Sequence, residues 1–166
     1  PLLGEAGALA AAAAVATVDA LGLPWPAEVV AEALESTKLR EVGRLHPVAL
    51  PGRGWLIDDA YNASPASVRS SARAAREMAD HTGGELVLVI GEMGELGQRS
   101  ESLHRELGHD LASLGPSRVV GLRGDAAALV RGACAAGLEA TFTDEHEEAA
   151  EAARAGEGDV VLVKGS

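Results

Sequence analysis

The sequence predicts an α/β fold. We expect a mostly parallel, Rossmann-like sheet with helices on both faces, an antiparallel hairpin strand at its start, and a small helical segment before it. From residue 45 onward, short apolar runs typical of strands alternate with stretches of helical periodicity. The connections are short, as in repeated β-α-β units, in which helices cover both faces of a parallel sheet.

The composition is that of a globular protein and excludes several functions. The chain has 166 residues, of which 47% are hydrophobic and 23% charged, so it is neither disordered nor fibrous. With 14 basic residues, 25 acidic residues and 2% aromatics, we expect no nucleic-acid binding. No apolar run reaches the roughly 20 residues of a membrane helix, and the start lacks the basic head of a signal peptide. A single cysteine, Cys134, fits a reducing compartment, so the predicted location is cytoplasmic.

The first part of the chain predicts two small-residue helices. Residues 4–22 are mostly alanine and end at Gly22, which predicts a helix stop there. A second short helix is expected after Pro26, running to about Glu35. Alanine buries too little apolar surface to build a core alone, so we interpret residues 1–44 as a helical piece that packs on something larger.

A hairpin and a capped helix follow. Leu45–Leu50 and Trp55–Asp58 are strand-like and flank the turn 51–54, which predicts an antiparallel hairpin with its first strand at or near an edge of the sheet. Ser64 is expected to be the N-cap of the next helix, with Pro65 at its first position.

The remaining elements continue the alternation to the end of the chain. The helix that starts at Pro65 is expected to end at Gly83, and Asp144 and Glu147 have capping-box spacing before the last helix. In order, the predicted elements are strand 86–90, a helix carrying Leu103, Leu107, Leu111 and Leu114, strand 118–122, helix 125–136, strand 140–143, helix 145–155 and strand 160–164.

Chemistry-bearing residues collect at one rim of the predicted sheet. Ligands of open α/β sheets bind outside the carboxyl ends of the strands. The segments that follow the strands hold acidic residues, glycines and one lysine, whereas the opposite rim has ordinary linkers. These segments are Asp58–Asn62, Gly91–Glu95, Leu122–Gly124, Thr143–Asp144 and Lys164–Ser166.

Several of these features also have a plain structural explanation. Adjacent aspartates are common in turns, and a lysine at a strand end is either solvated or a cation for a carboxylate or phosphate. His104 is predicted at the mouth of the site or on the polar surface. The glycines at 91, 94 and 97 do not form G-x-G-x-x-G, and Glu92 and Glu95 would repel a pyrophosphate. Cys134 is interpreted as a small core residue.

Four segments resemble the C-terminal part of the Mur ligases. Gly43-Arg44 is similar to a Gly-Arg at the family's domain junction, and Asp58–Pro65 is similar to the motif after a strand in the form that the dipeptide-adding member carries. Gly91–Gly97, followed by Ser100 and His104, resembles a loop and helix of the member that adds a dipeptide, and Val163–Ser166 resembles its ending. The resemblance implies two domains: residues 1–44 as the helical tail of a central ATPase domain, and residues 45–166 as a C-terminal ligase domain without its last helix.

The resemblance implies an ATP-dependent, amide-bond-forming ligase of peptidoglycan synthesis. ATP and Mg²⁺, bound mainly by the central domain, would convert the carboxylate of a UDP-MurNAc-tripeptide to an acyl phosphate, which the amine of D-Ala-D-Ala then attacks. The sequence contains no G-x-x-x-x-G-K-[ST] phosphate loop, so we expect this chain alone to be inactive. The implied partners are these two substrates, and a monomer is expected.

The resemblance also implies residue roles. Arg44 would reach the ATP phosphates, which suits a permanently charged, bidentate guanidinium. Asp59 would bind the ribose hydroxyls, with Asn62 and Tyr61 in the same nucleotide pocket. Lys164 is the predicted partner of the dipeptide carboxylate and, with Arg44, a predicted catalytic residue. The predicted substrate-binding residues are Asn62, Ser64, Glu92, His104, Lys164 and Ser166, and no metal ligand is predicted.

The sequence departs from the family pattern in two places, and three alternative functions remain open. The polar residues that the family carries near its adenine site are missing after Gly4, and Glu92 stands where aspartate is usual. The alternatives are another Mur ligase, a non-catalytic binding domain, and a phospho-receiver module. The last has an acidic pair, a threonine and a lysine at strand ends, which Asp58, Asp59, Thr143 and Lys164 imitate.

Overall fold

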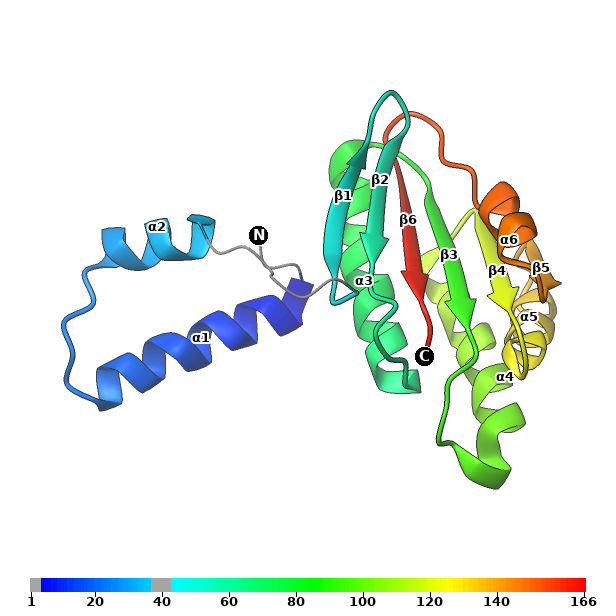
Figure 1. The fold of residues 1–166 in the computed structure, drawn as a ribbon, viewed down its shortest axis with the longest axis horizontal. Helices are drawn as coiled ribbons and strands as arrows, with labels where there is room; N and C mark the ends of the chain where they lie inside the picture. The colour runs from blue at the N-terminus through cyan, green and yellow to red at the C-terminus, as the bar shows by residue number, and fades with distance from the viewer. Residues whose placement is uncertain (1–3, 37–42) are drawn as a thin grey trace. The chain divides into compact units, whose positions relative to one another are not determined.

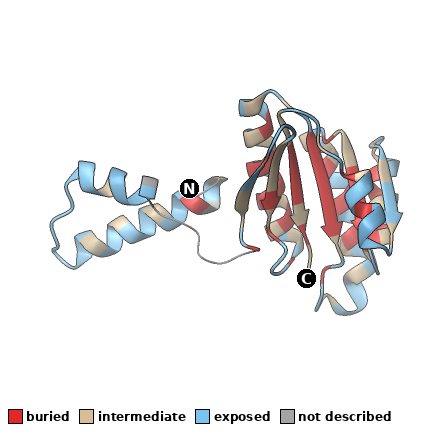
Figure 2. Ribbon diagram, turned by 45° about the horizontal axis from the view of Figure 1, so that its top comes forward, coloured by how far each residue is buried: buried red, intermediate tan, exposed pale blue. Residues whose placement is uncertain are grey.

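The chain divides into two compact units, residues 1–41 and 42–166. The structure, a computed structural model, describes residues 4–36 and 43–166. The first unit contains helices α1 (Gly4–Ala20) and α2 (Ala27–Ser36), which confirms the two predicted helices. Gly22 has a left-handed φ of 65°, as expected for a residue that ends a helix. The ribbon of these helices is mostly coloured as exposed (Figure 2), and Leu9 and Val29 are 63% and 57% exposed.

The second unit is built on a six-stranded sheet in the order β1-β2-β6-β3-β4-β5 (Figure 1). The edge strand β1 runs antiparallel to β2, and the other neighbouring pairs are parallel, which confirms the predicted hairpin and sheet. The last strand lies between β2 and β3, whereas receiver domains have the order 2-1-3-4-5. The strands are β1 (His46–Leu50), β2 (Gly54–Asp58), β3 (Leu86–Gly91), β4 (Arg118–Leu122), β5 (Ala140–Thr143) and β6 (Asp159–Lys164).

Helices cover both faces of the sheet, as predicted. On β4, Val120 packs in one cluster with Ala149 of α6, whereas a Cβ at the next residue, Gly121, would lie 2.8 Å from the carbonyl oxygen of Ala126 in α5. Successive strand residues point to opposite faces, so α5 and α6 lie on opposite sides. The helices are α3 (Pro65–Thr82), α4 (Ser100–Asp110), α5 (Ala126–Ala135) and α6 (His146–Ala152).

The central strands and helices α3, α4 and α5 contribute the buried residues of the core. All of Leu86–Ile90 is buried, as expected for a parallel strand covered on both faces (Figure 2). Ser64 caps α3 in a capping box with Ser67, and Gly83 ends this helix in the left-handed conformation. Both ends of α3 therefore agree with the prediction from cap chemistry.

Helices α4 and α5 approach each other through a reciprocal pair of glycines. A Cβ added to Gly108 would lie 2.0 Å from the carbonyl oxygen of Leu129, and one added to Gly132 would lie 2.0 Å from that of Arg105. Neither position has room for a side chain, so the crossing of these two helices depends on glycine at both.

Three local predictions are wrong in detail. The leucine-rich helix ends at Asp110, and Leu111 and Leu114 instead lie in a 3₁₀ turn, η2 (Leu111–Leu114), which left-handed Gly115 ends. The N-cap residue of α6 is Glu145 rather than Asp144, and Thr143 Oγ1 accepts the Glu145 backbone N–H. Cys134 is exposed rather than part of the core, and its Sγ lies 3.7 Å from the Ala140 carbonyl of the edge strand β5. None of the described helices is long and apolar enough to cross a membrane.

Candidate functional site

The predicted rim of the sheet brings together the ends of β2, β3 and β6. Asp58 at the end of β2 pairs with Val163 of β6, and Ile90 of β3 pairs with Lys164. The segments that follow these three strands therefore start side by side, although they lie far apart in the sequence. The polar residues predicted as a site are gathered here.

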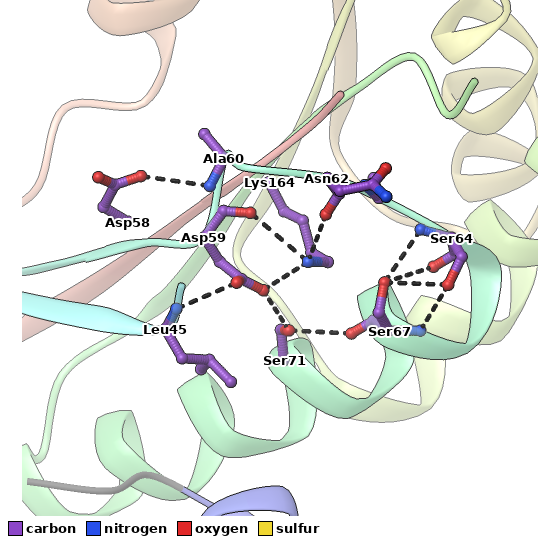
Figure 3. Close-up of polar contacts among 10 residues, drawn as sticks. Leu45, Asp58, Asp59, Ala60, Asn62, Ser64, Ser67, Ser71 and Lys164 are labelled. Carbon is purple, nitrogen blue, oxygen red and sulfur yellow. Dashed lines mark hydrogen bonds and ion pairs between the residues drawn. The ribbon is translucent and has the colours of Figure 1, made fainter. Parts of the chain in front are cut away.

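Asp59 and Lys164 form a buried ion pair at the centre of this rim (Figure 3). Lys164 Nζ lies 2.6 Å from Asp59 Oδ2, and only 4% and 10% of the two side chains are exposed. The ammonium group also donates to the backbone carbonyl of Asn62 at 2.9 Å. These contacts use the charge of Lys164 inside the protein, and its predicted contact with a dipeptide carboxylate stays a prediction.

The carboxylate of Asp59 connects three elements. Its Oδ2 accepts from Lys164 on β6 and from the Ser71 hydroxyl on α3, and its Oδ1 accepts from the Leu45 backbone N–H at 3.0 Å (Figure 3). Leu45 has a left-handed φ of 45°, which is unfavourable for a leucine. The hydrogen bond that the Leu45 N–H donates to Asp59 holds the backbone in this conformation, directly after Arg44. The predicted contact of Asp59 with a ribose stays a prediction.

Arg44 is held against the turn that follows β2. The Tyr61 N–H donates to the Gly43 carbonyl at 3.0 Å, and the guanidinium carbon of Arg44 lies 4.1 Å from the centroid of the Tyr61 ring. This is a cation–π contact, in which the ring face attracts the positive charge. Arg44 is exposed, and 63% of Tyr61 is exposed. A guanidinium held in this way presents donors suited to phosphate oxygens.

In the loop after β3, three successive backbone N–H groups each donate a hydrogen bond. The Glu92 N–H donates to the Leu122 carbonyl, the Met93 N–H to His104 Nε2, and the Gly94 N–H to Ser166 Oγ. The Ser166 hydroxyl in turn donates to the carbonyl of Glu92 at 2.9 Å. The loop is therefore fixed by β4, α4 and the end of β6.

His104 does not lie at the mouth of the site, contrary to the prediction. It is fully buried, and Nδ1 lies 2.8 Å from the Ser100 carbonyl while Nε2 accepts from Met93. Because a backbone N–H always donates, the proton of the neutral ring is on Nδ1. With both ring nitrogens used, a direct substrate contact of His104 does not fit this structure.

A pocket of about 510 Å³ lies between the turn after β2 and the loop after β3. Glu92 and Glu95 supply two carboxylates, and the described lining residues include no lysine or arginine. Such a lining favours a ligand with a positive group. The lining residues are Asn62, Ala63, Ser64, Glu92, Gly94, Glu95, Leu96 and Ser166.

The structure divides the predicted site residues into three groups. The pocket contains four of them, Arg44 and Tyr61 form an exposed pair, and Asp59, Lys164 and His104 are buried around the site. Glu95 was not predicted as a site residue, although its place after a strand is a usable signal. Within the described part of the chain, no three acidic, histidine or cysteine side chains come together to hold a metal ion.

Comparisons with known proteins agree with the resemblance. The sequence model of the family described as "Mur ligase, glutamate ligase domain" matches residues 43–166. The chain is 31% identical over 119 residues to the UDP-N-acetylmuramoyl-tripeptide–D-alanyl-D-alanine ligase of Bacillus subtilis, covering 72% of this chain and 24% of that protein. It is 38% identical over 78 residues to the enzyme of the same name from Escherichia coli K12, covering 47% of this chain and 16% of that protein.

The structural comparison covers nearly all of the chain. The crystal structure of a MurF ligase from Thermotoga maritima in complex with ADP superimposes with a TM-score of 0.77 at 28% sequence identity. The match includes 98% of this chain and 35% of that one. The chain therefore spans about a third of this structure and a quarter or less of the two curated relatives.

Proposed function

This chain belongs to the Mur ligase family, and we propose that it is the C-terminal portion of a ligase that joins D-Ala-D-Ala to a UDP-MurNAc-tripeptide with the use of ATP. In this proposal, residues 45–166 are the ligase domain and residues 1–44 are the tail of a central ATPase domain. The family match and the strand order argue against the receiver alternative. The names of the relatives support the dipeptide as substrate.

One observation carries the proposal. The two segments whose sequences resemble the dipeptide-adding member, Asp58–Pro65 and Gly91–Gly97, form the two sides of a single pocket at the carboxyl ends of the strands. Ser166, from the third such segment, closes it by contacting Gly94 and Glu92. Three segments that resemble this member in sequence therefore meet in one place.

The pocket chemistry suits the amine end of a dipeptide. Glu92 and Glu95 would attract the ammonium group, while Asn62, Ser64 and Ser166 offer amide and hydroxyl groups for hydrogen bonds to the peptide. Holding the amine in a fixed position lowers the barrier to its attack on an activated carboxyl group. The translational and rotational entropy of the amine is then lost on binding and not in the chemical step.

Arg44 would act on the nucleotide side of the site. Its guanidinium lies against the Tyr61 ring, and a permanently charged guanidinium suits the binding of phosphate oxygens through two N–H groups. A relative crystallised with ADP supports a nucleotide in this family. The described residues form no group of three or more potential metal ligands, so we derive no step through Mg²⁺.

An ADP-release assay on the full-length ligase tests the proposal. The enzyme would be given ATP, UDP-MurNAc-tripeptide and one of four amine substrates: D-Ala-D-Ala, meso-diaminopimelate, lysine or D-glutamate. We expect release that depends on D-Ala-D-Ala. Release that depends on another amine would assign the chain to a different Mur ligase, and no release with any of the four would favour a non-catalytic domain.

A further inference from the structure

We propose that His104 is a positioning residue for the pocket: it does not touch the substrate but fixes, through the Met93 N–H, the loop that carries Glu92 and Glu95. The inference rests on the proposed function for its kinetic readout, although not for its structural one. No other described side chain bonds to the Met93 N–H. Three steps lead to this role.

The first step is the position of Met93 in the loop. Its side chain is 1% exposed, whereas its neighbours Glu92 and Gly94 are exposed and line the pocket. The loop therefore turns about Met93, with one residue held inside and a pocket residue on each side. A shift of the Met93 backbone would move both neighbours.

The second step is the orientation of the imidazole. His104 lies one helical turn after Ser100, whose carbonyl is 2.8 Å from Nδ1, so the first turn of α4 holds the ring in place. With the proton on Nδ1, Nε2 is an acceptor aimed at Met93 at 3.0 Å. The donor and acceptor roles of the ring are both used, which an apolar core residue could not reproduce.

The third step is the cost of losing this acceptor. The bond between Met93 and His104 is buried, so without Nε2 the Met93 N–H has no replacement partner unless the loop moves. The neighbouring Gly94 N–H bonds to Ser166 on a different element and cannot hold Met93. We therefore expect the loop, rather than the whole domain, to respond.

Two matched variants separate the two ring nitrogens. His104→Gln keeps an acceptor at the distance of Nε2, and His104→Asn keeps only a donor close to Nδ1. In the full-length ligase we expect His104→Asn to raise the KM for D-Ala-D-Ala about tenfold, the effect of one unsatisfied buried donor. The KM values for ATP and UDP-MurNAc-tripeptide should stay unchanged, and His104→Gln should restore the dipeptide KM.

Hydrogen–deuterium exchange gives a readout that needs no catalysis. We expect the Met93 amide to lose protection in His104→Asn and to keep it in His104→Gln. If His104→Asn does not fold, His104→Leu fills a similar buried volume without an acceptor and should behave in the same way.

The outcomes are distinct. Faster exchange at Met93 together with a raised dipeptide KM supports the positioning role. Unchanged exchange at Met93 in a folded His104→Asn overturns it, as does an equal rise of all three KM values. If the wild-type enzyme shows no activity with D-Ala-D-Ala, the proposed function fails, while the exchange experiment still decides whether His104 positions the loop.

Discussion

Lys164 and Asp59 are 105 residues apart in the sequence, yet the ammonium of one lies 2.6 Å from the carboxylate of the other in a buried pair. Asp59 also accepts from Leu45 and Ser71, so a single carboxylate connects the end of β6, helix α3 and the segment that carries Arg44. The buried pair therefore helps to position the segments that carry the exposed site residues.

Breaking the buried pair should strongly destabilise the fold. Lys164→Met leaves the Asp59 carboxylate without a counter-charge, and we expect a loss of about 3–5 kcal/mol in the free energy of unfolding, measured by urea denaturation. The double variant Asp59→Asn with Lys164→Met should cost less than the sum of the single variants, because no unpaired charge remains.

An exposed ion pair provides the control. Arg154 and Glu151 are 2.9 Å apart with 66% and 72% of their side chains exposed, so Arg154→Met should change stability by less than about 1 kcal/mol. Additive costs for Asp59 and Lys164 would mean that the two residues are not coupled in solution.

The fold was predictable because local patterns determine it. The apolar run Leu86–Ile90 is continuous because both faces of its strand are covered, and Ser64 identifies the start of α3 through cap chemistry alone. The close contact of α4 and α5 through two glycines was not predictable. Nothing in the sequence around Gly108 or Gly132 indicates which helix packs against it.

The position of the site in the fold was predictable from the sequence, but the roles of its individual residues were less so. Strand ends indicate which residues share a rim, and Asn62, Glu92 and Ser166 do meet there. Whether a polar residue faces a ligand or the protein depends on partners far away in sequence, as with Lys164, which donates to Asn62, and His104, which accepts from Met93. Spacing within a motif does not contain this information.

Arg44 should be needed for turnover but not for folding. Arg44→Ala in the full-length ligase removes an exposed cation, and we expect turnover to fall on the order of 100-fold, as when one charge-stabilising donor is removed. Tyr61→Phe keeps the aromatic face and should be nearly neutral, whereas Tyr61→Leu should reproduce part of the loss. Steady-state kinetics and a thermal unfolding curve test both points. Unchanged kinetics in Arg44→Ala would remove this residue from the site.

The glycine contact between α4 and α5 should be intolerant of any side chain. Gly132→Ala places a methyl group against the Arg105 carbonyl, and we expect a loss of about 1–3 kcal/mol or more from overpacking, measured by chemical denaturation. Cys134→Ala, on the exposed side of the same helix, should be within about 0.5 kcal/mol of wild type. Equal stability of the two variants would show that the helices separate without cost.

Substitution of Gly124 by alanine should alter the pocket more than the stability of the fold, because the added methyl group meets the carboxylate of Glu92. The added Cβ would lie 2.3 Å from Glu92 Cδ, and this flexible side chain can move away, giving up its bond from the Asp125 N–H. Gly115 has a similar φ, 56° against 50° for Gly124, and nothing lies within 4 Å of its added Cβ. Both alanine variants should therefore lose about 1 kcal/mol in the free energy of unfolding from the left-handed backbone conformation alone.

Only Gly124→Ala should also change substrate binding, since only it displaces Glu92 from the pocket. We expect the KM for D-Ala-D-Ala to rise about three- to tenfold in Gly124→Ala, equivalent to roughly 1 kcal/mol, and to stay at the wild-type value in Gly115→Ala. Kinetics of the two full-length variants, compared at equal stability, measure this difference. The same KM in both variants would show that Glu92 does not bind the dipeptide, because the backbone penalty is common to the two positions.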